Sequence, residues 1–333
     1  MKTNKLIKFT YLLLTALAMG QTLHADNFGS GVNAFTIDFV NVGNAGNAND
    51  RALDDTDNTP GNPNDDEYAS PFGGVAYGFR MGTYEVSEDM ITKANAEGGL
   101  GITKDTRGVD KPATSVSWNE AARFVNWMNT SRGFSAAYKF TLQPGGIGYN
   151  ANANISLWQI GDAGYDASNP YRDSRAIYFL PSENEWYKAA FYSGSGTTFY
   201  DYATESNTIP TPVSNGASGA VYNGQSGPAD VDNAGGSSFY GTEAQNGNVW
   251  EWNESAFDAP NDSSSELRAF RGSGWVNIEG NLRSSIRGDS NPTFEFSDTG
   301  FRVASVPEPS TVSLLGFGGS ALFLQLRRRR KLS

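Results

Sequence analysis

The spacing of hydrophobic and polar positions predicts a small number of regular elements in this chain. Residues 35–40, Phe-Thr-Ile-Asp-Phe-Val, alternate apolar and polar side chains and predict a strand, and residues 75–86 predict a second strand. Residues 115–129 and 180–191 instead carry apolar side chains at helical spacing. Two helices in a chain of 333 residues that is rich in Gly, Asn and aromatic residues indicate an irregular fold with long loops.

Both predicted helices begin with the same capping signal. Ser117 is followed three residues later by Glu120, and Ser182 by Glu185. In such a capping box the serine hydroxyl and the glutamate carboxylate each accept a hydrogen bond from a backbone N–H group of the first turn. Each apolar stripe contains a tryptophan that we expect in the core, Trp118 and Trp186.

The stretch Gly247–Trp252, Gly-Asn-Val-Trp-Glu-Trp, places one carboxylate between two large rings. In an extended chain Trp250 and Trp252 lie on one face and Glu251 on the other, because strand side chains alternate. The rings can then fill a core while the carboxylate faces a loop or an ion. The pattern is compatible with a metal ligand, a sugar-binding platform, or a core strand with a structural carboxylate.

The first 25 residues are typical of a secretory signal peptide. Three lysines precede the apolar run Tyr11–Met19, and small residues then lead into acidic sequence. We expect the cut after Ala25, and a cut after Gly20 is the alternative. The protein is therefore expected in the cell envelope, on the cell surface or in the extracellular matrix.

The last 28 residues combine three features in a fixed order. Val306-Pro-Glu-Pro309 is followed by an apolar run over residues 311–326 and by five consecutive basic residues, Arg327–Lys331. The run is short for a stable membrane span, but as a helix it would enter a membrane with the basic residues on the cytoplasmic side. This order resembles the PEP-CTERM sorting signals of bacteria. The resemblance implies processing by an exosortase in a Gram-negative bacterium that makes extracellular polysaccharide.

The region between these two ends is strongly acidic. The whole chain has 25 basic and 36 acidic side chains. Without the 3 lysines of the signal peptide and the 5 basic residues and one glutamate of the tail, residues 26–305 keep 17 basic and 35 acidic groups, a net charge of −18. Such a surface repels nucleic acid, so we expect no nucleic-acid partner. It attracts cations instead, calcium among them.

Residue types exclude several kinds of chemistry. The chain contains no cysteine, and its one histidine, His24, lies in the predicted signal peptide. With a cut after Ala25, the exported domain has no disulfide, no thiolate metal site, no cysteine nucleophile and no histidine base. Carboxylates, Lys, Tyr, Ser and oxygen-ligated metals remain, and calcium is the metal that suits them.

An insertion rich in Asp, Asn, Gly and Pro covers residues 41–67. Its segment Asp54–Asn58 is similar to the start of a calcium loop, but it lacks the glycine and the distal glutamate of an EF-hand. We therefore expect a solvated insertion at this place.

Six motifs follow one another in an order that is specific to one family. They are Met81–Ser87, Pro112–Asn129, Leu180–Ala190, Gly247–Trp252, Arg271–Trp275 and Gly300–Ala304. Together they resemble the domain of the formylglycine-generating enzyme, or sulfatase-modifying factor, family over about residues 35–305. The resemblance implies an α+β fold of the C-type-lectin-like kind, with little regular secondary structure and long loops.

The resemblance also implies what the site lacks. Active members oxidise a substrate cysteine to formylglycine at a copper site of two cysteines that follow the Arg-Gly-x-x-Trp motif. The matching positions here are Asn277 and Leu282, and neither side chain is the soft thiolate that copper(I) needs. Copper and the formylglycine-generating reaction are therefore not expected, and we assign no catalytic residue.

The same resemblance implies a calcium site at the Gly-Asn-Val-Trp-Glu-Trp loop. Its ligands would be the carbonyl groups of Gly247 and Val249 and the carboxylate of Glu251. A further Asn or Asp side chain is expected seven residues before the glutamate, but this position is Ala244. The site is therefore weakened, completed by water or Glu243, or absent. The alternative for Glu251 is a structural role with an N–H or arginine partner.

Buried arginines are the natural partners for such carboxylates. Four arginines lie among apolar or glycine residues in the sequence: Arg271, Arg283, Arg287 and Arg302. Each needs a carboxylate or carbonyl partner if it is buried, and we expect Glu251 and Glu185 among these partners.

These observations favour a secreted, surface-sorted and non-catalytic domain that binds extracellular polysaccharide or a surface protein. One alternative is a hydrolase of matrix glycans that uses a pair of carboxylates. A divergent enzyme of the formylglycine-generating type is another. Besides the bound ligand, the expected partners are an exosortase at the tail and the membrane through the C-terminal apolar segment.

Overall fold

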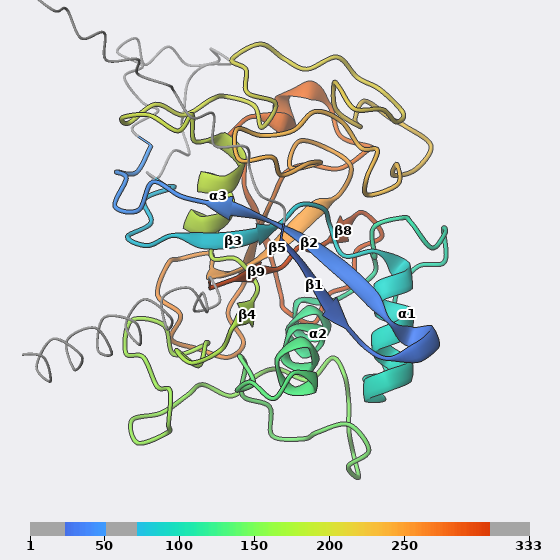
Figure 1. Cartoon of the computed structure of the whole chain (residues 1–333), viewed down its shortest axis with the longest axis vertical. Helices are drawn as coiled ribbons and strands as arrows, with labels where there is room; N and C mark the ends of the chain where they lie inside the picture. Colours follow the sequence, from blue (N-terminus) through green and yellow to red (C-terminus); the bar gives the residue numbers. More distant parts are fainter. Residues whose placement is uncertain (1–23, 51–71, 307–333) are drawn as a thin grey trace, which may run out of the picture.

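Two small sheets and three α-helices form the regular part of the residues that the structure describes. The computed structural model describes residues 24–50 and 72–306. A five-stranded antiparallel sheet has the order β1-β2-β3-β9-β4 (Figure 1). Its strands are β1 (His24–Phe28), β2 (Phe35–Val42), β3 (Phe79–Gly82), β9 (Ala304–Ser305) and β4 (Tyr178–Phe179).

The second sheet has four strands in the order β7-β6-β5-β8. They are β7 (Gly288–Ser290), β6 (Arg268–Arg271), β5 (Trp250–Ala256) and β8 (Thr299–Gly300). The pair β5–β8 is parallel and the other pairs are antiparallel. Strand β5 therefore has a neighbour on each side, and its side chains are almost all buried.

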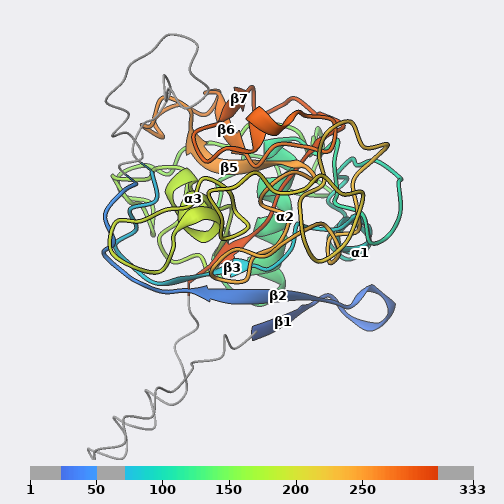
Figure 2. The same cartoon turned by 90° about the horizontal axis from the view of Figure 1, so that it is seen from above.

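Three α-helices accompany the sheets, together with two short 3-10 turns. The helices are α1 (Glu88–Gly98), α2 (Trp118–Ser131) and α3 (Glu183–Phe191), and the turns are η1 (Gly31–Asn33) and η2 (Glu279–Leu282). Figure 2 shows α2 and α3 between β1–β2 on one side and β5–β7 on the other. The predicted capping boxes of α2 and α3 are both formed. They satisfy N–H groups that would otherwise lack a partner in the first turn.

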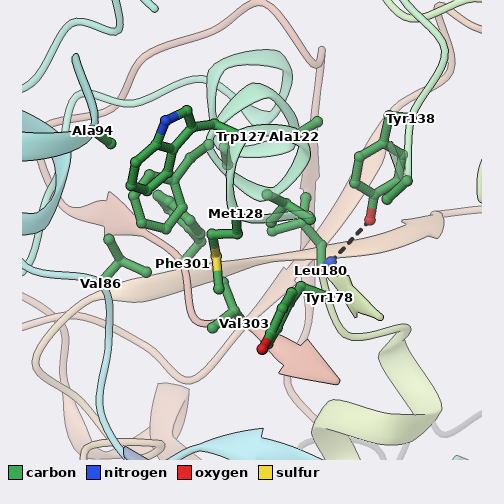
Figure 3. Packing of buried hydrophobic residues seen from close by; sticks show 14 of the residues in the cluster. Val86, Ala94, Ala122, Trp127, Met128, Tyr138, Tyr178, Leu180, Phe301 and Val303 are labelled. Carbon is green, nitrogen blue, oxygen red and sulfur yellow. Dashed lines mark hydrogen bonds between the residues drawn. The ribbon is translucent and has the colours of Figure 1, made fainter. Parts of the chain in front are cut away.

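The main core gathers around α2, which is buried on most of its surface. In Figure 3, Trp127 and Met128 of α2 lie beside Phe301 and Val303, which precede β9. Trp118 and Trp186 are fully buried, as predicted. The close packing of these large side chains holds the two sheets and the long loops in fixed positions.

The structure corrects two predictions about regular elements. The strand predicted over residues 75–86 is wrong in length, since β3 covers Phe79–Gly82; its neighbour β2 ends at Val42, opposite Phe79. The prediction of two helices is wrong as well, because α1 is a third. It buries few apolar side chains, Ile91 and Ala94 among them, so its periodic signal is weak. The strand predicted over residues 35–40 is confirmed as β2, but β2 continues to Val42, so the first two residues of the predicted insertion 41–67 belong to the sheet.

Several predicted segments lie outside the described residues. They are most of the signal peptide, residues 51–67 of the insertion, and the tail from residue 307 with its apolar run 311–326. Within the described ranges, no helix has the length and apolar character needed to cross a membrane. Strand β1 begins at His24, so a cut after Ala25 would remove its first two residues, whereas a cut after Gly20 would leave it whole.

Candidate functional site

Strand β5 and the turn before it present the motif Gly247–Trp252. Trp250 and Trp252 both pack edge-on against Phe270 of β6, with ring centroids 5.3 and 5.4 Å away. They therefore lie on one face of β5, and Glu251 projects from the other, as the alternation of the sequence predicts. All three side chains are buried.

Glu251 is the centre of a buried ion pair. Its two carboxylate oxygens accept hydrogen bonds from Nε and an NH₂ group of Arg302 at 2.6 and 2.7 Å. One of these oxygens also accepts a hydrogen bond from Nε1 of Trp186 at 2.7 Å. Both members of the pair are fully buried. Glu251 thus has the arginine partner that the structural alternative required.

Arg302 connects this carboxylate to the loops around it. Its remaining N–H groups donate to the carbonyl oxygens of Gly82, Thr83 and Glu243 at 2.7 to 3.0 Å. A fully paired and hydrogen-bonded arginine tolerates burial, because each charged N–H group has an acceptor. The pair therefore joins β3, β5 and the loop before β5 at one point.

The turn before β5 depends on glycine at one position. Gly247 has φ of +82°, and a Cβ atom there would lie 2.4 Å from the carbonyl oxygen of Val221. Asn248 follows with φ of +59°, and its side chain donates to Glu85 at 2.9 Å and accepts from the N–H of Ala229 at 2.8 Å. The turn is thus fixed by contacts with two distant loops.

Glu85 is a second buried carboxylate beside Glu251, and it belongs to the motif Met81–Ser87. Its Oε1 is held by Asn248, whereas its buried Oε2 has no hydrogen-bond donor among the described residues. Burial, followed by the nearby negative charge of Glu251, raises the pKa of Glu85 to about 8. Glu85 is therefore largely protonated at neutral pH.

The calcium ligands implied by the family resemblance can be tested against these contacts. No N–H or O–H group of residues 24–50 or 72–306 donates to the carbonyl oxygens of Gly247 or Val249. The Glu251 carboxylate, however, is engaged by Arg302, and Ala244 offers no side-chain oxygen. No three acidic or histidine side chains in the described part of the chain cluster in a way that could hold a metal. Calcium takes six to eight oxygens, so this donor set falls short and calcium at Gly247, Val249 and Glu251 stays a prediction.

The positions of the two copper ligands hold side chains with structural contacts. The side-chain oxygen of Asn277 accepts hydrogen bonds from Nε1 of Trp250 and from the N–H of Gly274, both at 3.0 Å. Leu282 is buried in an apolar cluster with Tyr202 and Tyr222. An amide locked by two donors and a leucine in a core provide no soft ligand for copper.

Glu185 was the second carboxylate predicted to pair with the four arginines that lie among apolar or glycine residues, and the structure has Glu183 in that role instead. Arg271 and Arg287 both pair with Glu183, with N–O distances of 2.7 and 2.6 Å, and not with Glu185. Glu185 is already used: one oxygen accepts from the N–H of Ser182 in the capping box at 2.7 Å, and the other accepts from the hydroxyl of Tyr77 at 2.8 Å. The capping motif in the sequence was the signal that could have indicated this.

Two family models match this chain and together cover its described residues from 24 onward. The model of a family described as "Sulfatase-modifying factor enzyme 1-like domain" matches residues 22–306, and that of the "PEP-CTERM protein-sorting motif" matches residues 305–330. No curated protein matches the chain.

Solved structures with the same fold share little sequence with this chain. Treponema denticola variable protein 1 has a TM-score of 0.57 at 19% identity, covering 85% of this chain and 99% of its own. CarF has 0.52 at 20% identity, covering 82% and 99%. PvdO from Pseudomonas aeruginosa has 0.50 at 18% identity, covering 85% and 98%. At such identities the likeness shows the fold, which is the expected α+β, C-type-lectin-like one, and it does not extend to activity.

Proposed function

Because the chain belongs to the sulfatase-modifying factor enzyme 1-like family and carries a PEP-CTERM sorting motif, we propose that this surface-sorted protein is a non-catalytic module that binds extracellular polysaccharide. The observation that carries the first half of this proposal is the pair Asn277 and Leu282. These residues stand where the family's copper ligands are expected, and both have structural contacts instead. The chain has no cysteine anywhere that could replace them.

The binding half rests on the shape and chemistry of the loops. A rigid core supports long irregular segments, and surface loops held by a rigid core are where binding residues concentrate. Apolar side chains are exposed on several of them, including Val276, Ile278 and Phe294. A glycan of the cell's own matrix is the ligand that suits the sorting signal, because the resemblance to PEP-CTERM signals implies a bacterium that makes extracellular polysaccharide.

The test uses the mature protein recovered from the cell surface and polysaccharide isolated from the same envelope. We expect binding in a pull-down or by calorimetry, no release of reducing sugar, and no aldehyde on a cysteine-containing peptide with copper added. Aldehyde formation would establish a divergent formylglycine-generating enzyme. Release of reducing sugar, abolished by neutralising one carboxylate, would establish a hydrolase. If the protein binds no glycan and captures a surface protein instead, the ligand is a protein and not a polysaccharide.

A further inference from the structure

A cavity of about 290 Å³ lies away from the Glu251 loop, at the place where the described chain ends. Its lining includes Tyr77, Asp166, Arg172, Ser174 and Val306, the last described residue. These residues come from segments far apart in the sequence, and no motif of the family marks them. The volume is close to the lower end of the range of small-molecule sites, so the cavity suits a small ligand.

Arg172 forms the charged wall of this cavity, and its position is fixed. Its guanidinium lies 3.9 Å from the ring centre of Phe179. It forms ion pairs with the buried carboxylates of Glu254 and Glu185, at 3.2 and 3.8 Å. Arginine has five side-chain N–H donors, and none of those of Arg172 makes a hydrogen bond of good geometry with a described residue. The side chain is 14% exposed, and its N–H groups that do not point at Glu254 or Glu185 can donate to an acceptor in the cavity.

The two carboxylates that hold Arg172 are themselves fixed by other residues. Glu254 accepts hydrogen bonds from the hydroxyl of Tyr138 at 2.8 Å and from the side chain of Asn169. Glu185 is fixed by its capping box and by Tyr77. A site whose groups are held by a second layer of contacts needs little rearrangement when a ligand binds.

The rim adds an aromatic face and an acceptor. Tyr77 lines the cavity and is 47% exposed, although its hydroxyl donates to Glu185 at 2.8 Å. The ring is therefore anchored at its hydroxyl end while much of the residue stays accessible. Asp166 accepts two hydrogen bonds from Ser168, at 2.7 and 2.8 Å, through Oδ1. Its Oδ2 receives none from the described residues and can accept one from a ligand.

The charge of the cavity decides between classes of sugar. Asp166 and Asp173 line the cavity beside Arg172. Arg172 is already paired with Glu185 and Glu254, and Asp173 is paired with Arg175. Carboxyl groups therefore outnumber guanidinium groups around the cavity, so an acidic sugar would meet net negative charge. A neutral sugar ring offers hydroxyls that both donate and accept, and C–H groups that pack on an aromatic face. We propose that this cavity binds a neutral pyranose unit of a polysaccharide, with Tyr77 under the ring and Arg172 and Asp166 on its hydroxyls. The proposal rests on the proposed function and names its site.

A larger cavity, about 530 Å³, lies along α2 and fits this role less well. Its arginine, Arg123, already donates to the carbonyl groups of Leu142, Asn150 and Ala151. Its tryptophan, Trp127, is 7% exposed. The polar groups there hold the surrounding loop and leave little for a ligand.

Four single variants of the mature protein test the site, with binding to a panel of neutral glucans and to the uronate polymer alginate as the readout. Tyr77→Ala removes the aromatic face and Asp166→Ala removes the acceptor. Tyr77→Phe keeps the ring and loses the bond to Glu185. Ile147→Ala changes a fully exposed apolar side chain elsewhere and is the matched control. Each variant is first checked for an unchanged thermal unfolding midpoint.

We expect neutral glucan binding to weaken about tenfold or more in Tyr77→Ala and Asp166→Ala, which corresponds to about 1.4 kcal/mol or more. Ile147→Ala should bind like the wild type. Tyr77→Phe should lose less affinity than Tyr77→Ala, because it keeps the ring and loses only the bond that holds it. Alginate should bind more weakly than the glucans. Wild-type binding that survives both alanine substitutions overturns this site and leaves the proposed function standing. A preference for alginate also overturns it. A wild type that binds no glycan overturns the proposed function and this site together.

Discussion

Replacing Glu251 with glutamine measures how much the buried ion pair stabilises the fold. Three donors converge on the carboxylate: Nε1 of Trp186 and two groups of Arg302, all within 2.7 Å. Glutamine offers one oxygen and one NH₂ group at the same place. At least one donor of Arg302 or Trp186 would then face another donor, and the charge of Arg302 would stay buried without its counter-charge.

Breaking a buried pair from one side costs about 3–5 kcal/mol. In a domain of this size, each kcal/mol corresponds to roughly 2 °C in the thermal midpoint, so Glu251→Gln should lower it by roughly 6–10 °C. Asp89→Asn is the control, because Asp89 pairs with Lys93 on the surface at 2.6 Å, and such exposed pairs contribute about 0–1 kcal/mol. Urea denaturation of the mature protein gives both free energies of unfolding.

The same measurement with chelator and with added calcium separates the two roles of Glu251. A loss below about 1 kcal/mol for Glu251→Gln in chelator would refute the reasoning from the arginine pair. Stabilisation of the wild type by calcium, lost in Glu251→Gln, would support the predicted ion at Gly247, Val249 and Glu251. A ligand at a hundred times its dissociation constant adds about 2.7 kcal/mol, which this assay resolves.

Three further predictions concern single residues. The raised pKa of Glu85, about 8, lies above its unfolded value, so the stability it contributes is full below about pH 4.5 and is lost as pH rises through 8; Glu85→Gln should flatten the pH dependence of the urea midpoint in that window. Gly247→Ala should cost about 1–3 kcal/mol because of its positive φ and the nearby Val221 carbonyl, whereas Gly280→Ala, with nothing within 4 Å of its added Cβ, should be nearly neutral by the same assay. Leu282→Ala should cost about 2–5 kcal/mol in thermal unfolding, since it empties a buried site at 1% exposure; a neutral result would show that Leu282 is not a core residue.

Local signals explain what could be predicted from the sequence. The capping boxes of α2 and α3 depend on residues three positions apart, and both were correct. Alternation predicted β2, which has one face against the core, and it predicted the two faces of β5, which are both buried, with the tryptophan rings on one and Glu251 on the other. The length of β3 depends instead on where β2 ends, and no pattern within residues 75–86 contains that information.

In the candidate sites, too, some contacts could be predicted from the sequence and others required the fold. The pairing of Glu251 with an arginine follows from the chemistry of buried charges, and the identity of Arg302 needed the fold. Glu183 was missed because both Glu183 and Glu185 lie in the first turn of α3, and the contacts of the two side chains separate only in three dimensions. The sugar cavity combines Tyr77, Asp166 and Arg172, which are too far apart in sequence for any spacing argument.

The sorting signal starts directly at the end of a central strand. Strand β9 lies between β3 and β4, and the N–H of Val306 still donates to the carbonyl of Ile177 at 3.0 Å. A cut downstream of Val306 leaves the sheet whole, whereas a cut before Ala304 would remove a central strand. Only five peptide units separate Val306 from the predicted membrane segment at 311, a reach of about 17 Å at roughly 3.5 Å each. If the apolar run enters a membrane as the sequence predicts, the face that carries the cavity beside Val306 lies close to that membrane for as long as the tail is attached.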